Sequence, residues 1–259
     1  MSVDEQFTKA FSRITRGWAV IGSLRKVALA GMPYAARVVD GQHKSLMADL
    51  TASGQLEKFI IGIKDSQDLQ KTADFLREKL TEQTLKNASY SVDAASLVFA
   101  HTVLDDALNS FLEITSEVAR DFWKQRVKRN KIELESLIDR GLDNALSSII
   151  DKEVSTIRRN DSMVKRAELL HAICQPSGGS GHPHYKFEPE KVREIDKLRQ
   201  DIVHGELLGG EIPEIEGNLT YLDDTSMYFF VMMHKSFGLR IDPAILTPAD
   251  SRCLLSKLT

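Results

Sequence analysis

Residues 91–118, SVDAASLVFAHTVLDDALNSFLEITSEV, carry the clearest structural pattern in the chain. Apolar side chains recur there every three or four positions, so at about 100° per residue they fall on one face of a helix. Ser91 stands where a serine caps a helix N-terminus. The pattern predicts an amphipathic helix that buries this face against other helices. The residues on the apolar face are Leu97, Ala100, Leu104, Ala107, Leu108, Phe111, Ile114 and Val118.

The segments on either side have helical composition and spacing as well. Gly31-Met32-Pro33, Asn87-Ala88-Ser89 and Asn160-Asp161 are typical of breaks between helices, because Gly, Pro and Asn favour turns. The Gly- and Ser-rich stretch 175–181 is expected to be the most flexible loop. We predict an all-α fold with helices over residues 4–30, 34–50, 68–85, 91–118, 120–151, 162–173 and 189–204.

The C-terminal quarter has fewer clear patterns. Gly209-Gly210 and Glu216-Gly217-Asn218 favour a loop with room for a small hairpin. Asp224-Thr225-Ser226 is placed to cap a last apolar helix that runs through Met233.

Composition narrows the classes of protein that this chain can represent. With 259 residues, 42% of them hydrophobic and 27% charged, it is expected to fold into one large or two smaller globular domains. A net charge of −3 excludes a general nucleic-acid coat protein, so any contact with RNA must be local. Cys174 and Cys253 have no CxxC spacing and are expected to be reduced thiols.

The chain shows no targeting or membrane pattern. Residues 1–7 include Asp4 and Glu5 and lack the basic start and apolar run of a signal peptide. No segment approaches 18 uncharged apolar residues, and the apolar stretch 18–24 is followed at once by Arg25 and Lys26. We therefore expect a soluble, cytoplasmic protein that does not contact a membrane.

The predicted helix Pro189–His204 contains an arginine in an unusual position. Pro189 suits the first turn of a helix, and Gly205 suits the left-handed residue that ends one. Arg199 falls within the apolar arc of this helix, where a charge must either be paired or serve a function. The arc is formed by Val192, Ile195, Leu198, Ile202 and Val203.

Arg199 and His204 together form a sufficient set of groups for RNA cleavage. His204 lies in the last turn, about 140° around the helix from Arg199, and a long arginine side chain can still reach the same cleft. Imidazole can move protons near neutral pH, and a guanidinium can stabilise negative charge on phosphate. Because the 2′-hydroxyl of RNA supplies the nucleophile, the reaction needs no metal or other cofactor.

The stretch Leu198-Arg199-Gln200-Asp201-Ile202-Val203-His204-Gly205 resembles the Arg-x4-His signature of HEPN domains. The lead-in at 185–190, the earlier helical stretch 101–108 and a closing helix after the motif are similar to that family's layout, over roughly residues 88–238.

The resemblance implies a bundle of four or five helices over residues 88–240. That bundle follows an N-terminal helical region, 1–87, and precedes a tail, 241–259. It also implies a homodimer in which Arg199 and His204 of both chains line one cleft. Members of the family are metal-independent endoribonucleases of toxin, antiviral or RNA-processing systems, so RNA is the expected substrate and an antitoxin or regulatory protein a further partner.

Two alternatives to a nuclease remain open. Gln200 stands where the family more often has Asn, Asp or His, and together with the acidic net charge it motivates a catalytically inactive module that binds RNA, a nucleotide or a protein. The other alternative is a structural adaptor in which Arg199 pairs with Asp105. A second Arg-x4-His spacing, Arg166 to His171, has Ala167 after the arginine and no following glycine, and we interpret it as unrelated to the motif.

Several other residues are candidates for the site. His101 projects into the apolar arc of its helix and Asp105 lies at its margin, so either could support Arg199, as could Gln200. Alternatively His101 is a hydrogen-bonded core residue. His182 and His184 near Cys174 are too few for a zinc site, and no metal is expected. The densest basic run is a candidate for RNA binding, with a solvated helix face as its alternative: Arg120, Lys124, Arg126, Lys128, Arg129 and Lys131.

Overall fold

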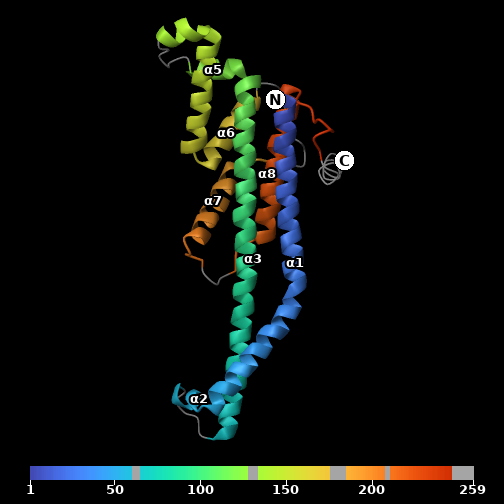
Figure 1. Cartoon of the computed structure of the whole chain (residues 1–259), viewed down its shortest axis with the longest axis vertical. Helices are drawn as coiled ribbons and strands as arrows, with labels where there is room; N and C mark the ends of the chain where they lie inside the picture. The colour runs from blue at the N-terminus through green and yellow to red at the C-terminus, as the bar shows by residue number, and fades with distance from the viewer. Residues whose placement is uncertain (60–64, 128–133, 176–184, 208–210, 247–259) are drawn as a thin grey trace. The chain divides into compact units, whose positions relative to one another are not determined.

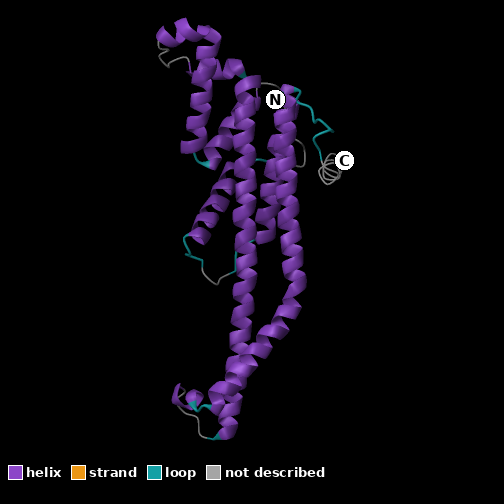
Figure 2. Ribbon diagram, in the orientation of Figure 1, coloured by secondary structure: helices purple, strands orange, loops and turns teal. Residues whose placement is uncertain are grey.

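The computed structural model describes residues 1–59, 65–127, 134–175, 185–207 and 211–246, with the backbone alone over 134–140. These residues form helices and connecting loops without a strand, which confirms the all-α fold (Figures 1 and 2). None of the described helices is long and apolar enough to span a bilayer. The helices are α1 (Val3–Ala52), α2 (Gln55–Phe59), α3 (Ser66–Val118), α4 (Arg120–Val127), α5 (Leu134–Asn160), α6 (Met163–Cys174), α7 (Pro189–Val203) and α8 (Ile215–Phe237).

The chain divides into two compact units. The first, here called the bundle unit, contains residues 1–21, 97–201 and the described residues from 214 onward. The second, the hairpin unit, contains residues 22–96 and 202–213. Both α1 and α3 therefore contribute residues to each unit. The predicted N-terminal region 1–87 is not a unit by itself, since its first 21 residues belong to the bundle.

Aromatic side chains from α1, α3 and α8 form the centre of the bundle unit. Phe7 stacks on Phe230 with ring centroids 4.7 Å apart and also contacts Phe111, while Phe11 packs on the other edge of Phe230. In Figure 1 the beginning of α1, the end of α3 and α8 lie side by side, as these contacts require. The predicted apolar face of 91–118 is confirmed, because its members from Leu97 to Ile114 are all buried.

The predicted ends of three long helices are wrong. Ser91 and Asn87-Ala88-Ser89 lie inside α3, where the Ser91 hydroxyl donates to the carbonyl of Asn87 rather than capping a helix. Pro33 lies inside α1, so the two helices predicted on either side of it are one. Residues 216–218 and 224–226 lie inside α8, and the described part of 206–218 contains no hairpin. In α3 and α8 the helix continues because buried residues follow the local break signal, whereas α1 continues through Pro33 with no buried residue between Pro33 and Met47.

The segment after α8 is attached to the beginning of α1. The backbone N–H of Arg240 donates to Asp4 Oδ1 at 2.8 Å, and that of Asp242 donates to the hydroxyl of Thr8 at 2.9 Å. The first described residues of the predicted 241–259 tail therefore belong to the bundle unit.

The hairpin unit has a smaller core of its own. Met47, Leu56, Leu69 and Ala73 are buried together where α1, α2 and α3 meet. An ion pair between Arg25 and Asp93, with the nitrogen and oxygen 2.6 Å apart, links α1 to α3 within this unit.

The closest approach of α1 to α3 in the bundle unit occurs at Gly17. A Cβ atom at this position would lie 2.5 Å from Cγ2 of Val103, closer than carbon atoms tolerate. Gly22, further along α1, has no such neighbour, since a Cβ there would find no atom within 4 Å.

We expect Gly17→Ala to lower the free energy of unfolding by about 1–3 kcal/mol, because the added methyl group overpacks the helix contact. Gly22→Ala is the matched control and should stabilise the protein by about 0.5–1 kcal/mol, since alanine favours a helix over glycine. Urea denaturation followed by circular dichroism measures both. Equal stability of the two variants would contradict the close contact.

Candidate functional site

The motif helix α7 is held at both ends. At its start, the hydroxyl of Tyr221 on α8 accepts from the backbone N–H of Glu188 at 2.8 Å and donates to the Glu188 carbonyl at 2.9 Å. At its end, the N–H of Gly205 donates to the carbonyl of Ile202, and Gly205 has the predicted positive φ of 76°. The predicted start at Pro189 and the glycine stop are confirmed.

Arg199 lies on the bundle side of α7 and is partly buried. Its Nε is buried, and the described part of the chain provides no hydrogen-bond partner for this atom. Val192 and Ile195 of the predicted apolar arc are buried, whereas Val203 is 54% exposed, so the arc ends earlier than predicted. The predicted apolar arc is therefore buried over the first two turns of α7, and Arg199 lies near the C-terminal end of the arc.

His101 of α3 and Asp196 of α7 join the two helices. His101 Nε2 lies 2.9 Å from Asp196 Oδ1, and the second carboxylate oxygen of Asp196 accepts from Gln200 at 3.3 Å. Burial lowers the pKa of His101 below 6.5, and the neighbouring charge of Arg199 lowers it further, while Asp196 acts in the opposite direction. Because a carboxylate only accepts, the neutral ring of His101 must carry its proton on Nε2.

Asp105 pairs with Arg166 and not with Arg199, the partner that the adaptor alternative predicted. Arg166 of α6 donates to Asp105 Oδ1 and to Asn109 Oδ1, each at 2.5 Å, and Asn109 donates back to Asp105 at 3.2 Å. The side chain of Arg166 is only 8% exposed. A buried guanidinium requires such acceptors, so this network explains why an arginine stands at the first position of the second Arg-x4-His spacing.

His171, the other member of that spacing, also has a structural environment. Its Nδ1 lies 2.8 Å from the hydroxyl of Tyr228, its Nε2 lies 2.8 Å from the side-chain amide of Gln175, and its ring packs on Phe187 and Tyr228. Burial lowers its pKa below 6.5. Arg166 and His171 thus hold α6 to α3 and α8.

His204 is exposed in the turn that directly follows α7. The division between the two units falls after Asp201, so α7 gives Arg199 to the bundle unit and the chain after it gives His204 to the hairpin unit. Of the predicted site residues, the structure brings His101 and Gln200 together through Asp196, and it places Asp105 and Arg199 close enough for their charges to act on His101.

Sequence reasoning missed Asp196, Asn109 and Arg166. Asp196 had a usable signal, because it stands three residues before Arg199 and so shares its side of the helix. Asn109 likewise stands four residues after Asp105. Nothing in the sequence indicates that both belong with Arg166, which is 61 residues from Asp105.

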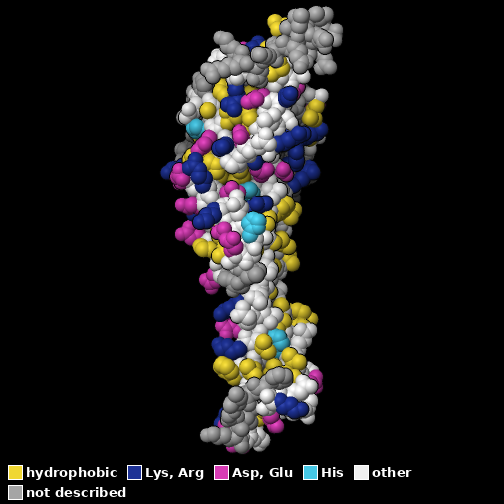
Figure 3. Space-filling model, turned by 90° about the vertical axis from the view of Figure 1, so that its left-hand side faces the viewer, with side chains coloured by type: hydrophobic (Ala, Val, Ile, Leu, Met, Phe, Trp, Pro, Cys, Tyr) yellow, Lys and Arg dark blue, Asp and Glu magenta, His cyan; other side chains and the backbone are white. Residues whose placement is uncertain are grey.

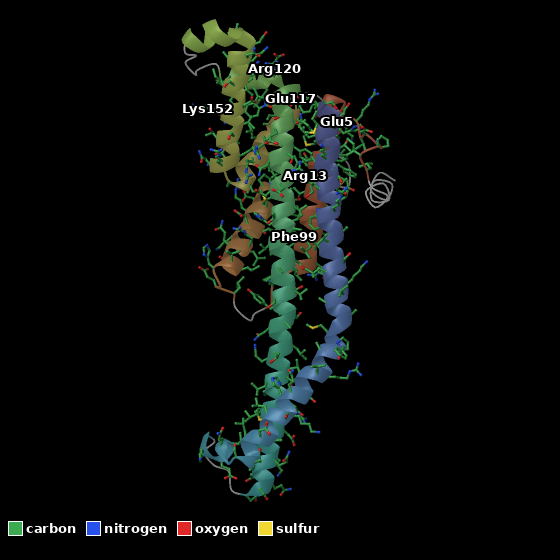
Figure 4. All side chains as sticks on the ribbon, viewed as in Figure 1. Glu5, Arg13, Phe99, Glu117, Arg120 and Lys152 are labelled. Carbon is green, nitrogen blue, oxygen red and sulfur yellow. The ribbon has the colours of Figure 1, made fainter. Side chains whose placement is uncertain are left out.

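Two described residues of the predicted RNA-binding run are bonded to α5 within the bundle unit. Arg120, which is labelled in Figure 4, donates to Ser147 at 2.6 Å, and Arg126 donates to Glu153 at 3.2 Å. Lys124 is exposed beside Asp121, and Trp123 between the two is buried, with its indole N–H donating to the hydroxyl of Thr115. Lys128, Arg129 and Lys131 lie outside the described residues.

The described residues contain no cluster of three His, Cys, Asp or Glu side chains that could hold a metal ion. Cys174 is buried, which raises the pKa of its thiol to about 12. His182, His184 and Cys253 lie outside the described residues.

The lowered pKa of His101 predicts a pH dependence of stability. The unfolded chain takes up a proton near pH 6.5, whereas folded His101 resists it, so the free energy of unfolding falls as the pH drops below about 6.5. His101→Gln keeps a donor for Asp196 but does not titrate, and should weaken this fall. Urea midpoints measured between pH 5 and 8 test it; a variant with the wild-type pH profile would contradict the assignment. His171 contributes with the same sign and should account for the remaining slope.

No protein-family model matches the chain. No solved structure matches it either. The function must therefore be argued from the residues themselves and from the geometry around α7.

Proposed function

We propose that this protein is a metal-independent endoribonuclease in which Arg199 and His204 act on the scissile phosphodiester. One observation carries the proposal: of the two Arg-x4-His spacings, Arg166 donates through both terminal nitrogens to Asn109 and Asp105, whereas Arg199 has no hydrogen-bond or ion-pair partner among the described residues; the Nε atoms of both arginines are buried without a partner.

The contrast matters because burying a guanidinium costs several kcal/mol unless acceptors replace the lost water. Arg166 meets this cost through its two terminal nitrogens, which donate to Asn109 and Asp105, although its Nε has no acceptor. Arg199 has no hydrogen-bond acceptor among the described residues for its buried Nε or for its terminal nitrogens, so the free protein does not offset the cost of burying it. A phosphate group supplies the missing acceptors, since its oxygens match the guanidinium fork.

In the proposed reaction, the ribose 2′-oxygen attacks phosphorus and the bond from phosphorus to the 5′-oxygen breaks. The products are a 2′,3′-cyclic phosphate and a 5′-hydroxyl, and no water is consumed. One proton leaves the 2′-hydroxyl and one reaches the departing 5′-oxygen. His204 is exposed and carries out one of these transfers, while Arg199 stabilises the charge that develops on the phosphate oxygens.

His101, Asp196 and Gln200 are positioning residues in this scheme. They connect α7 to α3 about one turn before Arg199. This contact fixes how α7 is rotated about its own axis, and so fixes the direction in which Arg199 points. The proposed assembly is a homodimer in which both copies contribute Arg199 and His204. A toxin or antiviral role, with an antitoxin as partner, is the corresponding biological proposal.

Purified protein incubated with mixed cellular RNA in EDTA should release fragments that end in 2′,3′-cyclic phosphate. His204→Ala should reduce the rate by about 100-fold or more, as expected for loss of a general acid or base. His171→Asn, in the other Arg-x4-His spacing, is the matched control and should still cleave.

Cleavage that survives His204→Ala would exclude this site. RNA that is bound but never cut would instead favour the inactive binding module. Light scattering coupled to gel filtration tests the assembly, because an active monomer would contradict a site shared by two copies.

The two arginines should also differ in their effects on folding. Arg166→Met should lower the free energy of unfolding by roughly 3 kcal/mol, because it leaves Asp105 without its cation. Arg199→Met should leave stability unchanged or higher and still abolish cleavage. Thermal denaturation beside the RNA assay separates the two effects; an Arg199→Met variant that fails to fold would show that Arg199 is structural.

A further inference from the structure

A hollow of about 280 Å³ lies between α6 and α7 in the bundle unit. Its charged and polar wall includes Lys165 and Glu168 from α6 and Arg193, Asp196, Lys197 and Gln200 from α7. Gln200 directly follows Arg199 in the chain, so the hollow borders the helix that carries the motif.

Both carboxylates in the wall are already engaged. Glu168 accepts from Arg193 at 2.8 Å. Asp196 accepts from His101 through one oxygen and from Gln200 through the other. Since burial lowers the pKa of His101, that ring is neutral at pH 7 and adds no positive charge behind Asp196.

The two lysines, by contrast, are exposed and have no ion-pair partner in the part of the chain that the structure describes. Three cations therefore face two carboxylates in this hollow, on a chain whose net charge is −3. Figure 3 shows basic side chains interspersed with acidic ones on the face that it presents.

We propose that this hollow binds a backbone phosphate of the RNA strand next to the one that is cut, with Lys165 and Lys197 as its ligands. The inference rests on the proposed nuclease function and assigns it a second contact with the substrate. It is a contact separate from the predicted basic run, of which Arg120 and Arg126 are bonded to α5. The two lysines come from different helices, so a phosphate between them is held from two sides.

The test measures binding of a fluorescein-labelled single-stranded 12-mer of uridine in EDTA, with His204→Ala as the parent so that the probe stays intact. Adding Lys165→Ala and Lys197→Ala should weaken binding roughly tenfold at 0.1 M salt and should make log Kd depend less steeply on log salt, by about 1 to 2. Lys9→Ala with Lys152→Ala, which removes the same charge from α1 and α5 (Figure 4 labels Lys152), should change neither quantity.

Equal Kd and equal salt dependence in the lysine variant and its control would overturn the proposal, as would a parent protein that binds no RNA. The proposed function fails separately, when wild-type protein does not cut RNA. If RNA binding depends on the two lysines but wild-type protein does not cut RNA, the phosphate subsite is supported and the nuclease function is excluded. If 10 mM inorganic phosphate weakens RNA binding as much as the two lysine substitutions do, the site binds free phosphate. That result would overturn the RNA assignment.

Discussion

The buried cation of Arg166 is the constraint around which the bundle unit is arranged. A guanidinium that is 8% exposed must be met by acceptors, and here Asp105 and Asn109 come from successive turns of α3. This ties the beginning of α6 to the middle of α3. His101, one turn before Asp105, then ties α7 to the same helix through Asp196. Together the two polar contacts determine where α6 and α7 stand, and so determine the wall of the hollow between them.

Much of the fold follows from local patterns, and the exceptions are helices that continue through a break signal. The apolar spacing of 91–118 and the Pro189 and Gly205 boundaries of α7 were correctly predicted, because each depends on neighbours within one or two turns. Pro33, Ser91 and Gly217 were misinterpreted as ends. After Ser91 and Gly217 buried residues follow at once, and their packing outweighs the local cost, whereas the residues around Pro33 are exposed or half-buried and α1 continues there without one backbone hydrogen bond.

The candidate site shows where sequence reasoning stops. The helical arc identified Arg199 as a charge in an apolar setting, since helical projection needs only local geometry. The same reasoning could not choose a partner for Asp105, because Arg166 and Arg199 are both far from it in the chain. Pairing across 61 residues is decided by how helices pack, and the structure assigns Asp105 to Arg166. That assignment adds a structural difference to the two Arg-x4-His spacings, which the sequence separates only by Ala167 and by the glycine after His204.

The attachment of the beginning of α1 to α8 and to Arg240 and Asp242 has a consequence for biosynthesis. Phe7 leaves the ribosome early, but its stacking partner Phe230 is 223 residues later in the chain. At ribosomal rates of about 5–20 residues per second, roughly 10–45 s separate the two. During that interval the apolar face around Phe7 and Phe11 has no partner from α8, and a nascent chain with such a face is a natural client for chaperones. The contacts of the segment made first are therefore complete only after α8 has been made, although Phe111 of α3 is present earlier.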